Sequence, residues 1–226
     1  IFKETPYVTM LMFGFSAYFG DIEWLMQATL DPEGAMAHNE ARLQVSLARV
    51  AKVIEAMGEH IQMLTINGDM GFQTGPMCRP SLVERVSIPY IKRFCEFVHR
   101  NSDIKVFLHS CGSIRPLIPM LIEAGVDVLN PVQISASNME PQELKAEYGD
   151  RIIFWGGGCD TQNVLGISSP EQVAANVREL VAVFKTGGGF VFNQVHNILA
   201  NVPPASVVAM FDAAYEQAFY ETTGRE

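Results

Sequence analysis

The segment 106–112 carries the strongest chemical signal in the chain: an apolar run that ends in His109 and Cys111, two residues apart, before a glycine. In an extended strand, residues i and i+2 point to the same side, so an imidazole and a thiolate at this spacing can converge on one ion. Zn²⁺ prefers nitrogen and sulfur ligands, and a catalytic zinc needs about three protein ligands and an open position. The structural alternative is a strand-end cysteine packed as a small hydrophobe and a histidine bonded to the backbone.

Short apolar segments alternate with helical patterns through most of the chain, which predicts βα units. We expect strands over residues 7–13, 61–67, 104–108, 126–129, 151–155 and 190–193. The expected helices cover residues 36–58, 81–101, 114–124 and 169–184, and a last one runs from the Pro203-Pro204 pair to about 222. Nearly continuous apolar strands joined by helices imply a parallel sheet that is buried on both faces.

Two closures of a parallel sheet are available, an open doubly wound sheet and a (β/α)₈ barrel. An open sheet usually carries a glycine-rich phosphate loop, and neither GxGxxG nor GxxxxGK[ST] occurs in the chain. We therefore predict an α/β fold, a barrel in one domain over residues 1–226. The chain begins at Ile1 close to an apolar strand-like run, so we expect it to be an internal piece of a longer protein.

In a parallel barrel the active site lies at the carboxyl ends of the strands. Polar side chains follow five successive predicted strands, and each could be explained singly as turn chemistry. A series of five on one face is harder to explain in that way. In chain order, the groups after the strands are Asn67, Asp69 and Gln73; His109 and Cys111; Asn130 and Gln133; Cys159 and Asp160; and Gln194 and His196.

Composition excludes several classes of protein. The chain has 226 residues, 48% of them hydrophobic, and a net charge of −9 with no run of Lys or Arg, so nucleic acid is not an expected partner. The four cysteines have no compact framework spacing, which indicates a reducing, cytoplasmic setting with free or metal-bound thiols. No segment reaches the roughly 18 apolar residues of a membrane span.

Three segments together resemble the uroporphyrinogen decarboxylase superfamily. Residues 68–76 are similar to its GDD-x-G-x-Q-x-G segment, residues 154–162 to its GG-x-D-x-Q segment, and residues 187–204 to its GGG ending with a later histidine and Pro-Pro. The resemblance covers essentially the whole chain. It implies a distorted TIM barrel that lacks its N-terminal part, with this chain forming the C-terminal two thirds. Ala205 stands where the superfamily usually has a glutamate.

Within that superfamily, the run His109-Ser110-Cys111-Gly112 is similar to the HxCG zinc motif of the corrinoid-dependent methyltransferases. The resemblance implies a zinc-dependent transfer of a methyl group from a methylated corrinoid, held on a carrier protein, to a small-molecule acceptor: a thiol such as coenzyme M, or tetrahydrofolate. The thiol methyltransferases have a third ligand, a cysteine, after the last strand. His196 stands at the matching place here, and Cys159 on the adjacent strand end is the alternative ligand.

The remaining strand-end groups are expected to orient the ligands or to bind substrate. We predict Asp69 as a catalytic group beside His109 and Cys111, and we predict cofactor binding by Gln73, Asn130, Gln133, Asp160 and Asn193. The second hypothesis for the whole chain is a metal-free decarboxylase acting on a porphyrinogen-like substrate, and the third is a noncatalytic barrel that binds a tetrapyrrole. The sequence does not fix the oligomeric state, and a homodimer is compatible with it.

Overall fold

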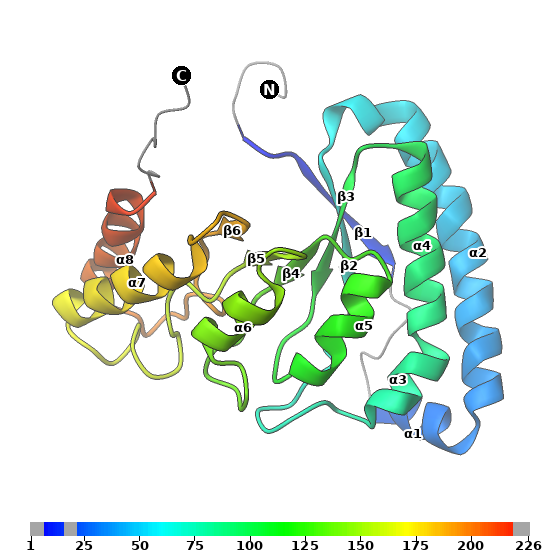
Figure 1. Ribbon diagram of the computed structural model, residues 1–226, viewed down its shortest axis with the longest axis horizontal. Helices are drawn as coiled ribbons and strands as arrows, with labels where there is room; N and C mark the ends of the chain where they lie inside the picture. The colour runs from blue at the N-terminus through cyan, green and yellow to red at the C-terminus, as the bar shows by residue number, and fades with distance from the viewer. Residues whose placement is uncertain (1–6, 16–21, 219–226) are drawn as a thin grey trace. The chain divides into compact units, whose positions relative to one another are not determined.

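The structure is a computed structural model that describes residues 7–15 and 22–218. The chain divides into two compact units, Ile1–Asn130 and Pro131–Glu226, and each is described by itself (Figure 1). None of the helices in the described part is long and apolar enough to cross a membrane.

Unit 1 is built on four parallel strands in the order β1-β2-β3-β4. They are β1 (Met10–Phe15), β2 (Met63–Asn67), β3 (Lys105–His109) and β4 (Val128–Asn130). Consecutive residues of β2 and β3 are buried, which is the pattern of strands covered on both faces. The register pairs Asn67 with His109 and His109 with Asn130, so the polar ends of three adjacent strands lie in one row.

Helices follow the first three of these strands. They are α1 (Ile22–Leu30), α2 (Pro32–Met57), η1 (Gly58–His60), α3 (Pro80–Val86), α4 (Ile88–Asn101), η2 (Arg115–Leu117) and α5 (Ile118–Glu123). The helix α2 begins where the Asp31 carboxylate accepts a hydrogen bond from the Gly34 amide, 2.9 Å away. In Figure 1, α2 and α4 run side by side, and they are tied by an Arg93–Glu40 ion pair whose second hydrogen bond is 3.0 Å long.

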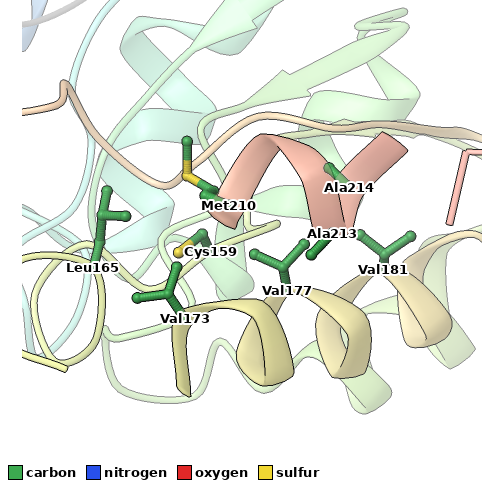
Figure 2. Packing of buried hydrophobic residues seen from close by; sticks show 8 residues of the cluster. All are labelled: Cys159, Leu165, Val173, Val177, Val181, Met210, Ala213 and Ala214. Atoms are coloured by element: carbon green, nitrogen blue, oxygen red, sulfur yellow. The ribbon is translucent and has the colours of Figure 1, made fainter. Parts of the chain in front are cut away.

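Unit 2 has two paired parallel strands, β5 (Ile153–Trp155) and β6 (Phe190–Val191). Its helices are α6 (Pro141–Tyr148), α7 (Pro170–Phe184) and α8 (Pro204–Glu216). A capping box between Ser169 and Gln172 begins α7. The packed faces of α7 and α8 form a core of small and aliphatic side chains (Figure 2).

Parallel strands alternate with helices, so the predicted α/β fold class is confirmed. All six predicted strands are present with ends shifted by a few residues, whereas a complete barrel has eight. The predicted helix 81–101 is divided between α3 and α4 at Ser87, because Pro89 has no amide hydrogen and disfavours helical geometry just before it. The helices α1 and α6 were not predicted, and the last helix ends at Glu216 within the described residues.

Candidate metal centre

Three side chains in unit 1 bring a nitrogen, a sulfur and an oxygen donor together at the strand ends. His109 is the last residue of β3, Cys111 follows two residues later, and Asp69 follows β2. The His109 Nε2 atom lies 3.6 Å from Cys111 Sγ and 3.9 Å from Asp69 Oδ1. All three ligand atoms lie within 4.8 Å of one another. The predicted convergence of His109 and Cys111 is therefore present, and the group includes Asp69 as well.

Asn130 sets the orientation of the imidazole. Its Oδ1 atom lies 2.7 Å from His109 Nδ1, and Asn130 itself is 7% exposed at the end of β4. A carbonyl oxygen can only accept, so this contact places the ring proton on Nδ1 and leaves the lone pair of Nε2 facing Cys111 and Asp69. A partner of this kind on the far ring nitrogen is typical of histidines that bind metals.

A hydrogen bond also holds Asp69 in place. Its Oδ1 atom accepts from the Cys111 amide at 2.8 Å, so one residue of the group positions another. The loop that carries Asp69 is fixed on both sides of this residue by two further hydrogen bonds. The Gly68 amide donates to the His109 carbonyl at 3.0 Å, and the Met70 amide donates to Ser110 Oγ at 3.0 Å. The donor set is thus pre-organised by the backbone of the two loops that carry it.

Two glycines allow those loops to touch. Gly112 has φ +87, and a Cβ there would lie 2.2 Å from the carbonyl carbon and oxygen of Gly71. A Cβ on Gly71 would lie 2.7 Å from the Ser113 amide nitrogen. Behind this contact the Ser113 amide donates to the Phe72 carbonyl at 2.8 Å. The glycine of the His-x-Cys-Gly run is therefore required both by its positive φ and by the close backbone approach.

The donor set fits a zinc ion. Two donors of a tetrahedral zinc site lie about 3.3–3.8 Å apart, given zinc–nitrogen and zinc–sulfur bonds of about 2.0–2.3 Å. The His109–Cys111 separation falls within that interval, and the His109–Asp69 separation is slightly larger. Burial raises the pKa of the Cys111 thiol to about 11, and the charge of Asp69 raises it in the same direction. A cation at this point would offset both effects, because it favours the thiolate.

The family to which this chain belongs is shown by a match to a protein-family model. The family model described as Uroporphyrinogen decarboxylase (URO-D) matches residues 17–217. The chain belongs to the uroporphyrinogen decarboxylase family. This match confirms the resemblance to the uroporphyrinogen decarboxylase superfamily.

Individual URO-D relatives match over shorter stretches. A uroporphyrinogen decarboxylase from Psychromonas ingrahamii is 33% identical over 72 residues, which are 32% of this chain and 20% of that protein. One from Dichelobacter nodosus is 25% identical over 133 residues, which are 59% of this chain and 36% of that protein. The chain thus spans about a fifth and about a third of the length of these two relatives.

Among solved structures, a methyltransferase from Methanosarcina mazei superposes with a TM-score of 0.66 at 15% sequence identity. The superposition covers 87% of this chain and 53% of that one, so the chain corresponds to about half of the methyltransferase. At this identity the likeness concerns the fold, and it places the α/β architecture with TIM-barrel-type proteins.

The other predicted binding residues have surroundings of their own within each unit. Gln73 is exposed in the loop after β2. In unit 2, Gln133 is 9% exposed, and its Nε2 atom lies 3.5 Å from Gln162 Oε1. Asp160 accepts from the amides of Gln162 and Asn163 at 2.9 and 3.0 Å, which makes it the cap of a turn. Asn193 is half-buried after β6, and its carbonyl accepts from the Gly158 amide at 2.8 Å.

The two predicted third ligands have opposite surroundings in unit 2. Cys159 is 0% exposed and belongs to the core between α7 and α8, where Figure 2 shows it among Val173, Val177 and Met210. Burial raises the pKa of its thiol to about 12, and the charge of Asp160 acts in the same direction. These are the surroundings of a packing residue. His196 is exposed in the segment after β6.

Sequence reasoning underestimated Asp69. It predicted a catalytic or rim group and not a metal ligand, and the structure places the Asp69 carboxylate directly beside the imidazole and the thiol. It also missed Ser110, whose buried hydroxyl fixes the Met70 amide. The parallel register was the available signal for Asp69, because it pairs Asn67 with His109 and so brings residues 67–69 next to residues 109–111.

Proposed function

We propose that this chain is part of a zinc-dependent methyltransferase that moves a methyl group from a methylated corrinoid to a thiol or to tetrahydrofolate. The observation that carries the proposal is the convergence of His109, Cys111 and Asp69 at the strand ends of a URO-D family chain. The likeness to a protein named as a methyltransferase supports the same choice.

In this proposal His109 Nε2 and Cys111 Sγ hold the zinc, and the Asp69 carboxylate is the third ligand. Asp69 replaces Cys159 in that role because the Cys159 side chain is enclosed by apolar neighbours. Asn130 keeps the imidazole in the tautomer that leaves Nε2 unprotonated. When bound, zinc supplies the positive charge that keeps an acceptor thiol deprotonated near neutral pH.

In this proposal the side chains of this chain hold and orient the methyl acceptor. The methyl donor is expected to arrive on a corrinoid carrier protein. The acceptor sulfur attacks the methyl carbon with its own electron pair, so a sulfur–carbon bond forms. The methylated corrinoid would supply the methyl group and would keep the electron pair of its carbon–cobalt bond, while the thiol proton would pass to solvent. The three donors lie at the exposed or half-buried ends of their strands, where such an acceptor can reach them.

A second candidate function is decarboxylation of a porphyrinogen-like substrate without a metal. It is favoured by the family description and by both relatives, which are named as uroporphyrinogen decarboxylases. In that case His109, Cys111 and Asp69 would be a polar group at the strand ends that binds substrate directly.

Turnover distinguishes the two functions. Zinc-loaded protein is incubated with methylcobalamin and either a set of small thiols or tetrahydrofolate, and the absorption spectrum of the corrinoid is followed. We expect demethylation with at least one acceptor, and its loss in Cys111→Ser. Carbon dioxide release from a porphyrinogen, without corrinoid demethylation by any acceptor, would favour the decarboxylase.

A further inference from the structure

Asn67 occupies the position next to His109 that the donor set leaves unused. It ends β2 and pairs in register with His109, so the two side chains project from the same side of the sheet. Asn130 occupies the corresponding position on the other side of His109 and is bonded to the imidazole. Asn67 is half-buried, and its carboxamide has no hydrogen-bond partner among the residues that the structure describes.

The sheet face beside Asn67 combines apolar and polar surface. Met12 of β1 pairs with Thr65 of β2, two residues before Asn67 and on the same side, and Met12 is 71% exposed. Thr65 is 3% exposed, and its hydroxyl has no partner in the described part of the chain. A buried polar group without a partner, such as the Thr65 hydroxyl, is uncommon in folded proteins, and a bound ligand or water is the usual explanation. The half-buried Asn67 carboxamide is open to such a ligand.

We propose that Asn67 is a positioning residue that hydrogen-bonds a neutral polar group of the methyl acceptor, and thereby selects thiols that carry a hydroxyl or an amide. The inference rests on the proposed function, because the acceptor sulfur must lie at the group formed by Asp69, His109 and Cys111. Adjacent strands are about 4.8 Å apart, a distance that a two-carbon chain with its polar group covers. A carboxamide both donates and accepts, which suits a neutral hydroxyl or amide.

The charge around Asn67 supports a neutral acceptor. Asp69 lies two residues away with its carboxylate in the donor group. Together with the Cys111 thiolate it would offset the two positive charges of a bound zinc, so the group offers no net positive charge to a carboxylate on the ligand. The exposed Met12 offers contact to the carbon chain of such a thiol. The acceptor class that fits these neighbours is a short, uncharged thiol with one hydrogen-bonding group.

Binding to the cobalt-substituted chain tests this assignment without turnover. Co²⁺ is loaded in place of zinc, and the thiolate-to-cobalt absorption band is titrated with ethanethiol, 2-mercaptoethanol and thioglycolate. We expect the wild-type chain to bind 2-mercaptoethanol about fivefold more tightly than ethanethiol, the usual effect of one neutral hydrogen bond. In Asn67→Ala the two affinities should become equal, and Asn67→Leu, which has no hydrogen-bonding group in its side chain, serves if the alanine variant does not fold.

Asn101→Ala is the matched control, since it makes the same change at the exposed end of α4. It should keep the fivefold preference, and all variants should bind one equivalent of Co²⁺. A preference that persists in Asn67→Ala or Asn67→Leu, or a preference for thioglycolate in the wild type, would overturn the role of Asn67 alone. A chain that binds Co²⁺ but no thiol would contradict the proposed function itself, and this inference with it.

Discussion

Replacement of Gly112 by alanine should damage the donor group without touching any donor. Gly112 has φ +87, and its added Cβ would lie 2.2 Å from the Gly71 carbonyl carbon and oxygen. The loop that carries Cys111 must then move away from the loop that carries Asp69. Because the Cys111 amide bonds Asp69 Oδ1 at 2.8 Å, this movement separates two of the three donors.

The size of the effect follows from two contributions. A non-glycine residue in the left-handed region costs about 1–2 kcal/mol. The overlap with backbone atoms, which have little freedom to shift, adds about 1–3 kcal/mol by analogy with overpacked cores. We therefore expect Gly112→Ala to lower the free energy of unfolding by about 2–5 kcal/mol.

Urea unfolding and zinc titration of the same variant measure both consequences. Gly75→Ala is the matched control, because it lies in the loop after β2 and a Cβ there would meet no atom within 4 Å. Gly75→Ala should unfold at the wild-type urea concentration and bind zinc normally, whereas Gly112→Ala should unfold earlier and bind zinc weakly. Wild-type stability and zinc affinity in Gly112→Ala would refute the reasoning about the two loops.

Three other changes have defined outcomes. Asn130→Ala should weaken zinc binding about 10–100-fold in a chelator competition, because the imidazole loses the partner that fixes its tautomer; wild-type affinity would argue against that role. Zinc affinity should rise about tenfold for each pH unit between roughly pH 7.5 and 9.5. The reason is that the Cys111 thiol, whose pKa is raised to about 11, must release its proton to bind zinc. A zinc affinity that does not change with pH would mean that this thiol is not a ligand. Cys159→Ala should keep its zinc, and loss of zinc in this variant would restore Cys159 as a ligand. Between about pH 9 and 12 the unfolded wild-type chain releases the Cys159 thiol proton while the folded chain retains it, so the wild type loses stability as pH rises. The alanine variant has no such thiol, and its free energy of unfolding should fall less over the same range.

The sequence was sufficient to predict the strands and the pair at the end of β3. Apolar runs with β-branched residues are a local signal, and the alternation of side chains in a strand relates His109 to Cys111 without tertiary information. The helix α1 was not predicted, and six of its nine residues are apolar, so few polar positions mark a helical period. The division of helix 81–101 was readable in principle from Pro89.

The composition of the donor set depends on contacts that local patterns do not contain. Cys159 and Asp69 both follow strands, and a thiol is the softer zinc ligand of the two. The side chain of Cys159 nevertheless belongs to the α7–α8 core, whereas the Cys111 amide directs Asp69 toward the imidazole. The packing of α8 against α7 makes Cys159 a core residue, and the parallel register of β2 with β3 makes Asp69 a donor beside His109. Neither contact is contained in a local sequence pattern.

Metal analysis of the purified chain tests the central claim most directly. Wild-type protein dialysed against zinc should retain about one zinc ion per chain, Cys111→Ser should retain much less, and Asp69→Asn should bind with reduced affinity. Cys78→Ser, a substitution of another half-buried cysteine in unit 1, should retain the wild-type amount. Full zinc content in Cys111→Ser, or no zinc in the wild type, would contradict a metal centre at the end of β3.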